Sequence, residues 1–365
     1  MFYYIPIEPL NERYTEQWYR WFPEALKKRK VPFQVIDGEP LNTKVECGTF
    51  LDINSTLHYK AEQLKKIAKL FFEKKIKPGD IFFVADLEFW GIESIRYLSD
   101  LNNIPVNIYA FLHAASYTCE DFMEKCSQYG KVFEEGWFKI CDKIFVGSEY
   151  HKKQVEKLRP IAYDKIVVTG NPYNIKEVKD KLKGIKIEKK NQIILTNRPD
   201  YEKRPNLSLD VFRILKRRHP DWDFMITTSR KAWGKGWIRE VALNEAKYGW
   251  LKIRENLLKE EYLIELAKSK VMISNTIEEN FGYCILEACI FDTIPIIENN
   301  YSHPELVNKD KRCLFNSIDE QIKKVEFAMA NPFKVNQYVK KYEESLDLIL
   351  EYCLFGKLKN PIIPL

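Results

Sequence analysis

The sequence predicts an α/β protein built from two doubly wound domains, each with a parallel sheet between layers of helices. Short apolar segments alternate with amphipathic helical patterns, which is typical of parallel strands joined by crossover helices. The alternation stops at a polar, lysine-rich stretch after position 170 and then starts again. A chain of 365 residues is also longer than one hydrophobic core usually supports. We therefore expect domains over residues 1–170 and 171–335, with a C-terminal helix and tail over 336–365.

The first domain is predicted from six apolar segments that have the composition of buried strands. They are FYYIPI (2–7), PFQVID (32–37), DIFFVA (80–85), VNIYAFL (106–112), KIFVGS (143–148) and KIVVTG (165–170). Helical periodicity fills the intervals, over residues 12–28, 57–74, 91–101, 132–141 and 149–158. The carboxyl ends of such strands meet at one edge of the sheet, where ligands bind.

The second domain repeats the pattern after Gly170-Asn171-Pro172 and the stretch NIKEVKDKLKGIKIEKKNQ, which we interpret as a linker. Its predicted strands are QIILTNR (192–198), DFMITTS (223–229), WLKIREN (250–256), KVMISN (270–275) and IPIIEN (294–299). Its predicted helices span 207–218, 259–268 and 283–291. A last helix over 335–352 carries an apolar stripe, and we expect it to return to the first domain.

Composition excludes several classes of protein. The net charge of +6 permits a polyanionic partner without requiring one. The eight cysteines contain no C-x-x-C pair, so reduced packing thiols are expected rather than a zinc site. No apolar run is long enough to cross a bilayer and the N-terminus lacks signal-peptide features, so we expect a cytoplasmic protein. A Gly-rich dinucleotide fingerprint and a P-loop are both missing, which argues against an NAD enzyme or a kinase.

The stretch EENFGYCILEACIFDTIPII, residues 278–297, places two carboxylates around a predicted helix start near Tyr283. A helix N-terminus presents unpaired N–H groups and the positive end of its dipole, which suits a phosphate or a sugar oxygen. Gly282 would let a ligand approach the backbone closely. Glu279 lies before the helix and Glu287 just over one turn into it, so both can face one ligand. The alternative is an ordinary strand-loop-helix with two exposed glutamates.

This motif resembles the donor site of the GT-B glycosyltransferases, in particular the retaining class of family four, which has Glu, seven residues and Glu with Phe-Gly between. The resemblance implies a GT-B fold, whose two domains face a cleft. It implies that Glu279 holds sugar hydroxyls and that Glu287 holds the nucleotide ribose. It further implies that the segment between them contacts the sugar or the diphosphate, through Asn280, Phe281, Gly282 and Tyr283.

A second match to this family lies in LTNRPDYEKRPNLSLDVFRIL, at the start of the second domain. Arg198 follows a strand, and Lys203-Arg204 stand in the next loop. The resemblance implies that an arginine and a lysine here grip the donor diphosphate, whose negative charge grows in the transition state. Either Lys203 or Arg204 could be the inward-pointing residue, and a surface turn is the alternative.

Polar residues after strands of the first domain are candidates for the acceptor side. His113 follows the strand 106–112, where the resemblance implies a catalytic histidine that contacts the transferred sugar. Asp86 and Glu88 follow the strand 80–85 and could bind the acceptor hydroxyl, although loop hydrogen bonds would explain them equally well. The first loop adds three further acceptor candidates: Glu8, Arg13 and Tyr14.

The resemblance implies transfer of a sugar from a UDP- or GDP-linked donor to a hydroxyl, with the anomeric configuration retained. Catalysis is assigned to His113, Arg198, Lys203 and Glu279, without a cofactor or an essential metal. ENFGYCILEACIFDTIPIIENNYSHPELV is similar to the tRNA-queuosine glycosyltransferases, and YIPIEPLNERYTEQWYRWF is similar to glycosyltransferases of DNA phages. We therefore expect a hydroxymethylated or otherwise modified base in nucleic acid as the acceptor. A lipid or saccharide acceptor and an inactive GT-B binding module are the alternatives.

Overall fold

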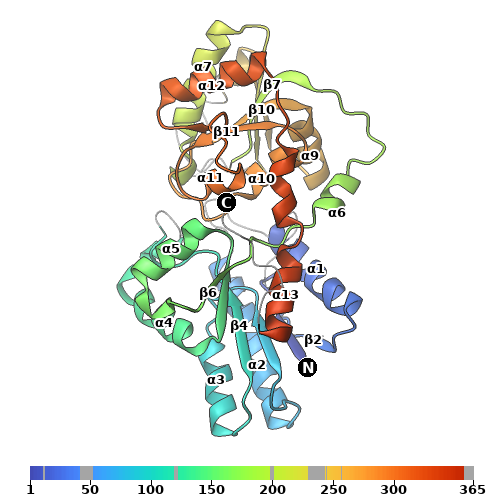
Figure 1. The fold of residues 1–365 in the computed structure, drawn as a ribbon, viewed down its shortest axis with the longest axis vertical. Coiled ribbons are helices and arrows are strands. Elements are labelled where there is room, and N and C mark those ends of the chain that lie inside the picture. Colours follow the sequence, from blue (N-terminus) through green and yellow to red (C-terminus); the bar gives the residue numbers. More distant parts are fainter. Residues whose placement is uncertain are drawn as a thin grey trace. The chain divides into compact units, whose positions relative to one another are not determined.

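The computed structural model describes residues 1–10, 13–41, 52–118, 122–197, 201–228, 243, 245–255 and 257–356 (Figure 1). These residues divide into two compact units. The first unit comprises Met1–Tyr173 together with the C-terminal segment from Glu344, and the second comprises Asn174–Glu343. The sequence predicts boundaries at 170/171 and 335/336, whereas the structure divides the chain at 173/174 and 343/344.

The sheet of the first unit has six parallel strands in the order β2-β1-β3-β4-β5-β6. The strands are β1 (Phe2–Ile5), β2 (Phe33–Val35), β3 (Ile81–Val84), β4 (Asn107–Phe111), β5 (Lys143–Val146) and β6 (Ile166–Val168). All four residues of β1 are buried, as expected for a parallel strand covered on both faces. The strand order reverses between β1 and β3, so the switch point of this sheet lies at their carboxyl ends.

The helices of the first unit cover this sheet and bury aromatic side chains against it. They are α1 (Tyr14–Lys28), α2 (Ile53–Phe72), α3 (Ile92–Leu101), α4 (Ser127–Ile140), α5 (Glu149–Leu158) and α13 (Ser345–Phe355). Trp18 and Phe22 stand four residues apart on α1 and are fully buried. The Phe22 ring stacks on Phe83 at 4.8 Å between centroids, and the Trp18 ring meets Phe111 edge-on at 4.9 Å. These contacts fix α1 over the centre of the sheet.

The C-terminal helix α13 belongs to the first unit, as the sequence predicts. It packs against α1, and its Tyr352 ring lies 5.7 Å from that of Phe145 (Figure 1). The prediction of one continuous helix over 335–352 is wrong. The structure has a 3₁₀ helix, Asn336–Tyr342, in the second unit, and α13 starts afterwards. Asp292 accepts bonds from both the Val335 and Asn336 amides at 3.0 Å, which anchors the start of the 3₁₀ helix in the second unit.

The second unit also has a six-stranded parallel sheet, in the order β12-β11-β10-β7-β8-β9. Its strands are β7 (Lys190–Leu195), β8 (Asp223–Thr228), β9 (Leu251–Glu255), β10 (Ser269–Ile273), β11 (Ile294–Glu298) and β12 (Leu314–Phe315). Counted within the unit this is the order 6-5-4-1-2-3 found in dinucleotide-binding sheets. The switch point lies between β7 and β10. The predicted α/β class with two doubly wound sheets is confirmed.

The described part of the second unit contains the helices α6 (Ile175–Asp180), α7 (Pro205–Arg218), α9 (Lys259–Lys268), α10 (Tyr283–Ile290), α11 (His303–Leu306) and α12 (Ile318–Ala330). Three of them, α6, α11 and α12, are absent from the sequence-based prediction. The lysine-rich stretch interpreted as a linker contains α6, whose first turn is capped by Asn174 Oδ1 accepting from the Glu177 amide at 3.0 Å. The helix α12 begins at Ser317, whose hydroxyl accepts from the Glu320 amide at 3.2 Å.

Candidate functional site

The switch point of the second unit is held together by a buried amide. Asn197, just after β7, donates from Nδ2 to Ser274 Oγ at 2.7 Å, just after β10. The thiol of Cys284, in the first turn of α10, donates to Asn197 Oδ1 at 3.3 Å. Three segments that are distant in sequence therefore meet at Asn197, where ligands bind in sheets of this type. Sequence patterns give no signal for this amide.

Lys203 and Glu279 form the ion pair of this switch point. Lys203 Nζ donates to Glu279 Oε2 at 3.2 Å and to Thr276 Oγ1 at 3.3 Å. Burial opposes ionisation of Glu279, but Lys203, nearby His303 and the Phe281 amide together hold its pKa below the usual value. Glu279 is therefore a carboxylate at neutral pH, suited to accept bonds from hydroxyl groups. Arg198, the other predicted diphosphate contact, lies outside the described residues.

Of the two adjacent basic residues, Arg204 does not point toward Glu279, because its guanidinium bonds to other groups. It donates to the carbonyl oxygens of Asn275 at 2.6 Å and Thr276 at 3.0 Å, and it also pairs with the Glu298 carboxylate. Its backbone is left-handed, with φ of 44°, directly before the first residue of α7. Lys203, not Arg204, thus contacts Glu279, and Arg204 fixes the end of β10.

The loop between Glu279 and α10 consists of Asn280, Phe281 and Gly282. Gly282 caps α10 with φ of 93°, a left-handed conformation that favours glycine. Phe281 is buried, and its ring meets the Tyr342 ring edge-on at 5.2 Å, so its side chain belongs to the core. Asn280 and Tyr283, the two other predicted donor contacts, flank this segment and are half-buried. The α10 N-terminus lies four residues after Glu279, as the motif predicts.

Glu287 lies on α10 and is buried, with 3% of its surface exposed. The Lys259 ammonium contacts its Oε1, and the Tyr262 hydroxyl donates to its Oε2 at 2.7 Å. Both partners come from α9. The sequence motif identifies Glu287 but gives no signal for Lys259 or Tyr262, which stand 28 and 25 positions earlier.

His303 is a further member of the site that was not among the predicted site residues, although it lies in the stretch ENFGYCILEACIFDTIPIIENNYSHPELV. Ser302, its neighbour, donates its amide to the Glu279 carbonyl at 3.2 Å and its hydroxyl to the Phe281 carbonyl at 3.1 Å. His303 Nδ1 donates to the Glu298 carbonyl at 3.0 Å, so in the neutral ring Nε2 is an acceptor. Burial lowers the pKa of His303 to about 4, even though Glu279 raises it.

In the first unit, His113 lies at the carboxyl end of β4 within an aromatic cluster. Its ring centroid is 5.3 Å from that of Tyr14 and 5.0 Å from that of Trp18. Its Nε2 carries a hydrogen, because it bonds to the Ala85 carbonyl at 3.0 Å and a carbonyl can only accept. Burial lowers the pKa of His113, opposed by Asp86 and by the bond to Ala85. The ring is therefore neutral and held in one orientation.

A buried lysine, Lys60 on α2, organises the carboxylates of the first unit's switch point. Its Nζ lies 3.3 Å from Asp86 Oδ2 and also donates to the Glu88 carbonyl. Burial opposes its charge, but Asp86, Glu88 and Glu8 raise the pKa of Lys60 above its usual value. Asp86 and Glu88 are half-buried and share this edge with His113. Lys60 was not predicted, because α2 is distant in sequence from these strands.

The three remaining acceptor candidates, Glu8, Arg13 and Tyr14, make different contacts in the structure. Glu8 is buried, and its oxygens accept from Ser55 Oγ at 2.9 Å and Thr56 Oγ1 at 2.7 Å. Its observed contacts therefore hold the start of α2, and its acceptor role stays a prediction. Arg13 is half-buried at the N-cap of α1, and Tyr14 packs on the His113 ring.

Comparison with known proteins identifies the family. Residues 162–345, half of the chain, match the family described as Glycosyl transferases group 1. The chain belongs to this family. The matched segment contains Lys203, Glu279 and Glu287, and the resemblance to glycosyltransferases seen in the sequence is confirmed.

One curated relative of this group 1 glycosyl transferase is the tRNA-queuosine alpha-mannosyltransferase of Drosophila melanogaster. The two sequences are 24% identical over 214 residues, which is 59% of this chain and 53% of the relative. The chain thus spans about half the length of the curated relative it matches.

Solved structures show the fold. Sucrose-phosphate synthase from Thermosynechococcus elongatus superposes with a TM-score of 0.66 at 11% identity, covering 96% of this chain and 95% of that one. The UDP-forming alpha,alpha-trehalose-phosphate synthase from Burkholderia vietnamiensis gives 0.60 at 12% identity, covering 95% and 94%. Both are GT-B proteins, and the predicted GT-B fold is confirmed.

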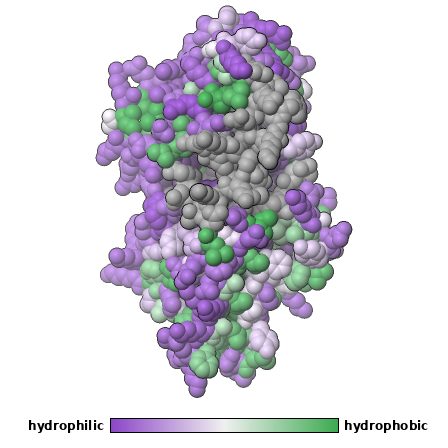
Figure 2. Space-filling model, turned by 180° about the vertical axis from the view of Figure 1, so that it is seen from behind, coloured by the Kyte–Doolittle hydropathy of each residue, from purple (hydrophilic) through white to green (hydrophobic). Residues whose placement is uncertain are grey.

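Among the described helices, none combines the length and apolarity needed to span a bilayer. On the face drawn in Figure 2, hydrophobic residues form separate small groups among hydrophilic ones. Within the described part of the chain, no cluster of three or more His, Cys, Asp or Glu side chains could hold a metal ion.

Proposed function

We propose that this protein is a retaining glycosyltransferase that moves a sugar from a nucleoside diphosphate sugar to a hydroxyl group on a modified base of nucleic acid. The observation that carries the proposal is the Lys203–Glu279 pair at 3.2 Å, at the switch point of a dinucleotide-type sheet and directly before the start of α10. A cation, a hydroxyl-binding carboxylate and a helix N-terminus together match the parts of a sugar diphosphate.

The donor is proposed to bind to the second unit with its diphosphate at the N-terminus of α10. There Lys203, already partly buried beside Glu279, stabilises the charge that grows on the leaving diphosphate. Glu279 accepts bonds from sugar hydroxyls and Glu287 from the ribose. Because Lys203, Arg198 and the helix terminus supply positive charge, the proposed reaction uses no metal and no cofactor. UDP- and GDP-linked sugars are the proposed donors, and an excess of EDTA should leave the rate unchanged.

Retention of configuration is proposed from the Glu-x₇-Glu motif of the sequence. In such a reaction the acceptor hydroxyl attacks the face from which the diphosphate leaves. The two glutamates act by positioning the substrate, not as the acid and base of a glycosidase. His113, neutral and fixed by Ala85, is proposed to contact the transferred sugar, and Asp86 and Glu88 are proposed to bind the acceptor.

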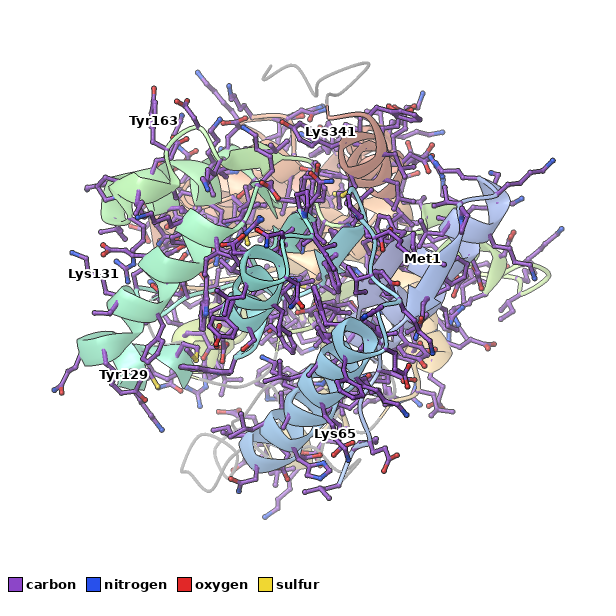
Figure 3. The ribbon with its side chains drawn as sticks, turned by 90° about the horizontal axis from the view of Figure 1, so that it is seen from below. Met1, Lys65, Tyr129, Lys131, Tyr163 and Lys341 are labelled. Carbon is purple, nitrogen blue, oxygen red and sulfur yellow. The ribbon has the colours of Figure 1, made fainter. Side chains whose placement is uncertain are left out.

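A nucleic-acid acceptor is supported by two observations. The curated relative is named for the modified tRNA base queuosine. In addition, lysines project from the helices of the first unit, including Lys65 on α2 and Lys131 on α4, whose side chains are 76% and 58% exposed (Figure 3). Exposed lysines favour contact with phosphates. A base within a duplex would have to be flipped out to react. We propose hydroxymethylated pyrimidine in DNA, as in phage genomes, as the first acceptor to examine.

The test incubates the full chain with UDP- and GDP-linked hexoses and a panel of acceptors, and follows release of the free nucleotide. The panel contains hydroxymethylpyrimidine DNA, unmodified DNA, queuosine-containing tRNA, a polyprenyl phosphate and free saccharides. Release that depends on a modified base, and that Glu279→Gln and Lys203→Met abolish, supports the proposal. Release with the lipid or the saccharides alone refutes the nucleic-acid acceptor. If none of the donors reacts or binds, the proposed glycosyltransferase activity is refuted.

A further inference from the structure

Glu287, the carboxylate proposed to bind the ribose, is bonded by two residues that are not part of the sequence motif, Lys259 and Tyr262. It is buried at 3% exposure on the second turn of α10, and a buried carboxylate is costly unless it is paired and hydrogen-bonded. The Lys259 ammonium contacts Oε1, while the Tyr262 hydroxyl donates to Oε2 at 2.7 Å. Each oxygen thus has its own partner, which fixes the rotation of the carboxylate plane.

The two partners of Glu287 are themselves held in place by α9. Lys259 is its first residue and Tyr262 follows three positions later, so both side chains lie on one face of the helix. The Lys259 ammonium also lies 5.0 Å from the centroid of the Tyr262 ring, within cation–π range. The helix start is fixed by Glu261, whose Oε2 accepts from the Leu258 amide at 3.0 Å. The arrangement therefore exists before a ligand binds.

We infer that Lys259 and Tyr262 are positioning residues for the ribose and set a preference for ribonucleoside over 2′-deoxyribonucleoside diphosphates. This inference rests on the proposed function, because it assumes that Glu287 faces the ribose. A carboxylate with a fixed orientation discriminates strongly between a ligand that has a hydroxyl and one that lacks it, because the remaining lone pair that it directs at the ligand then accepts no hydrogen bond. A carboxylate free to rotate would discriminate less.

Lys259 has a second effect on an anionic ligand. A nucleoside diphosphate carries negative charge a few bonds from its ribose, and an uncompensated carboxylate at the ribose would repel it. The ammonium of Lys259, with 19% of its side chain exposed, offsets the charge of Glu287. The pair can therefore bind hydroxyls without weakening the binding of the adjoining diphosphate.

The test measures dissociation constants of UDP, GDP and their 2′-deoxy counterparts by titration calorimetry. The full chain is compared with Lys259→Met, Lys259→Arg, Tyr262→Phe and the control Lys252→Met. Lys252 lies on β9 in a half-exposed ion pair with Asp223 at 2.9 Å. In the wild type the ribo form should bind at least tenfold more tightly than the deoxy form. Lys259→Met and Tyr262→Phe should reduce that ratio at least threefold, and Lys259→Arg and Lys252→Met should preserve it.

Three results would overturn the inference, and one of them would also contradict the proposed function. If Lys259→Met and Tyr262→Phe weaken ribo and deoxy ligands by the same factor, the two residues support the fold or the phosphates and do not position the ribose. A wild type that binds both forms equally refutes the inference alone. A wild type that binds neither nucleotide refutes the proposed donor site as well. Tyr262→Phe removes a single hydroxyl, so the comparison survives if Lys259→Met does not fold.

Discussion

Replacing Gly282 by alanine should destabilise the second unit and weaken donor binding together. Gly282 has φ of +93°, and a Cβ atom there would stand 2.9 Å from Leu306 Cδ1, 3.2 Å from Ile285 Cδ1 and 3.4 Å from Glu279 Cγ. The left-handed backbone alone costs a non-glycine residue about 1 to 2 kcal/mol. Displacing the packed Leu306 and Ile285 methyl groups adds about 1 kcal/mol. The unfolding free energy should therefore fall by about 2 to 3 kcal/mol.

The control variant Gly184→Ala separates the cost of the left-handed backbone from the cost of displacing packed side chains. Gly184 belongs to the same unit and has φ of +85°, but a Cβ atom at this position would have no neighbouring atom within 4 Å. This variant should lose only the backbone contribution, about 1 to 2 kcal/mol. Urea denaturation of both variants, followed by fluorescence, measures the difference. Since the new methyl group also touches the Glu279 side chain, Gly282→Ala should weaken binding of the nucleotide sugar about tenfold or more, and Gly184→Ala should not.

The reasoning fails if Gly282→Ala is no less stable than Gly184→Ala, or if it binds the donor as tightly as the wild type. The first result would mean that Leu306 and Ile285 move at no cost. The second would mean that the donor does not approach the backbone at the start of α10.

Three further predictions concern charges in the two units. Glu134 is buried in a 2.6 Å ion pair with Arg159, so Glu134→Gln should lower the unfolding free energy by about 3 kcal/mol. Glu135, its neighbour on the same helix, is half-exposed in a pair with Lys131, so Glu135→Gln should change the unfolding free energy by less than about 0.5 kcal/mol. Equal losses in denaturant titrations would contradict this prediction. Lys203→Met should reduce kcat for nucleotide release by about 100-fold or more in a steady-state assay, and Lys203→Arg should reduce it by less. An unaltered kcat would show that Lys203 does not stabilise the transition state. The pKa of His303 is about 4 in the folded protein and near 6.5 in the unfolded chain, so its contribution to stability is constant at high pH and is lost as the pH falls below about 6.5. The loss between pH 7.5 and pH 5 is about 2 kcal/mol. His303→Asn, which can keep the bond to the backbone carbonyl, should abolish this loss in the measured pH profile of stability, and an unchanged profile would show that the pKa of His303 is not lowered by folding.

The strand pattern was predictable because buried parallel strands are continuous apolar runs of β-branched and aromatic residues. Each of the predicted strands overlaps an observed one, as FYYIPI overlaps β1. The strand β12 has two residues and carries too little pattern to detect. The helix α12 follows Ser317 with Glu320 three positions later, a recognisable helix start that the prediction passed over. The helix α6 was hidden because lysines dominate its segment.

The donor motif was predictable because its residues are consecutive in the sequence, but its partners were not. Lys203 and Arg204 are adjacent and chemically similar, and only the left-handed backbone at Arg204 sends one toward Glu279 and the other toward Asn275. Lys60 and Lys259 reach their sites from the helices α2 and α9. Such contacts depend on how distant segments pack, which one sequence does not record.

A crystal structure of the full chain with a bound UDP- or GDP-sugar tests the central claim most directly. We predict that the diphosphate accepts hydrogen bonds from the amides at Gly282 and Tyr283 and lies within hydrogen-bonding reach of Lys203 Nζ, with the ribose hydroxyls on Glu287. A nucleotide bound away from the start of α10, or one whose sugar makes no contact with Glu279, would contradict the account.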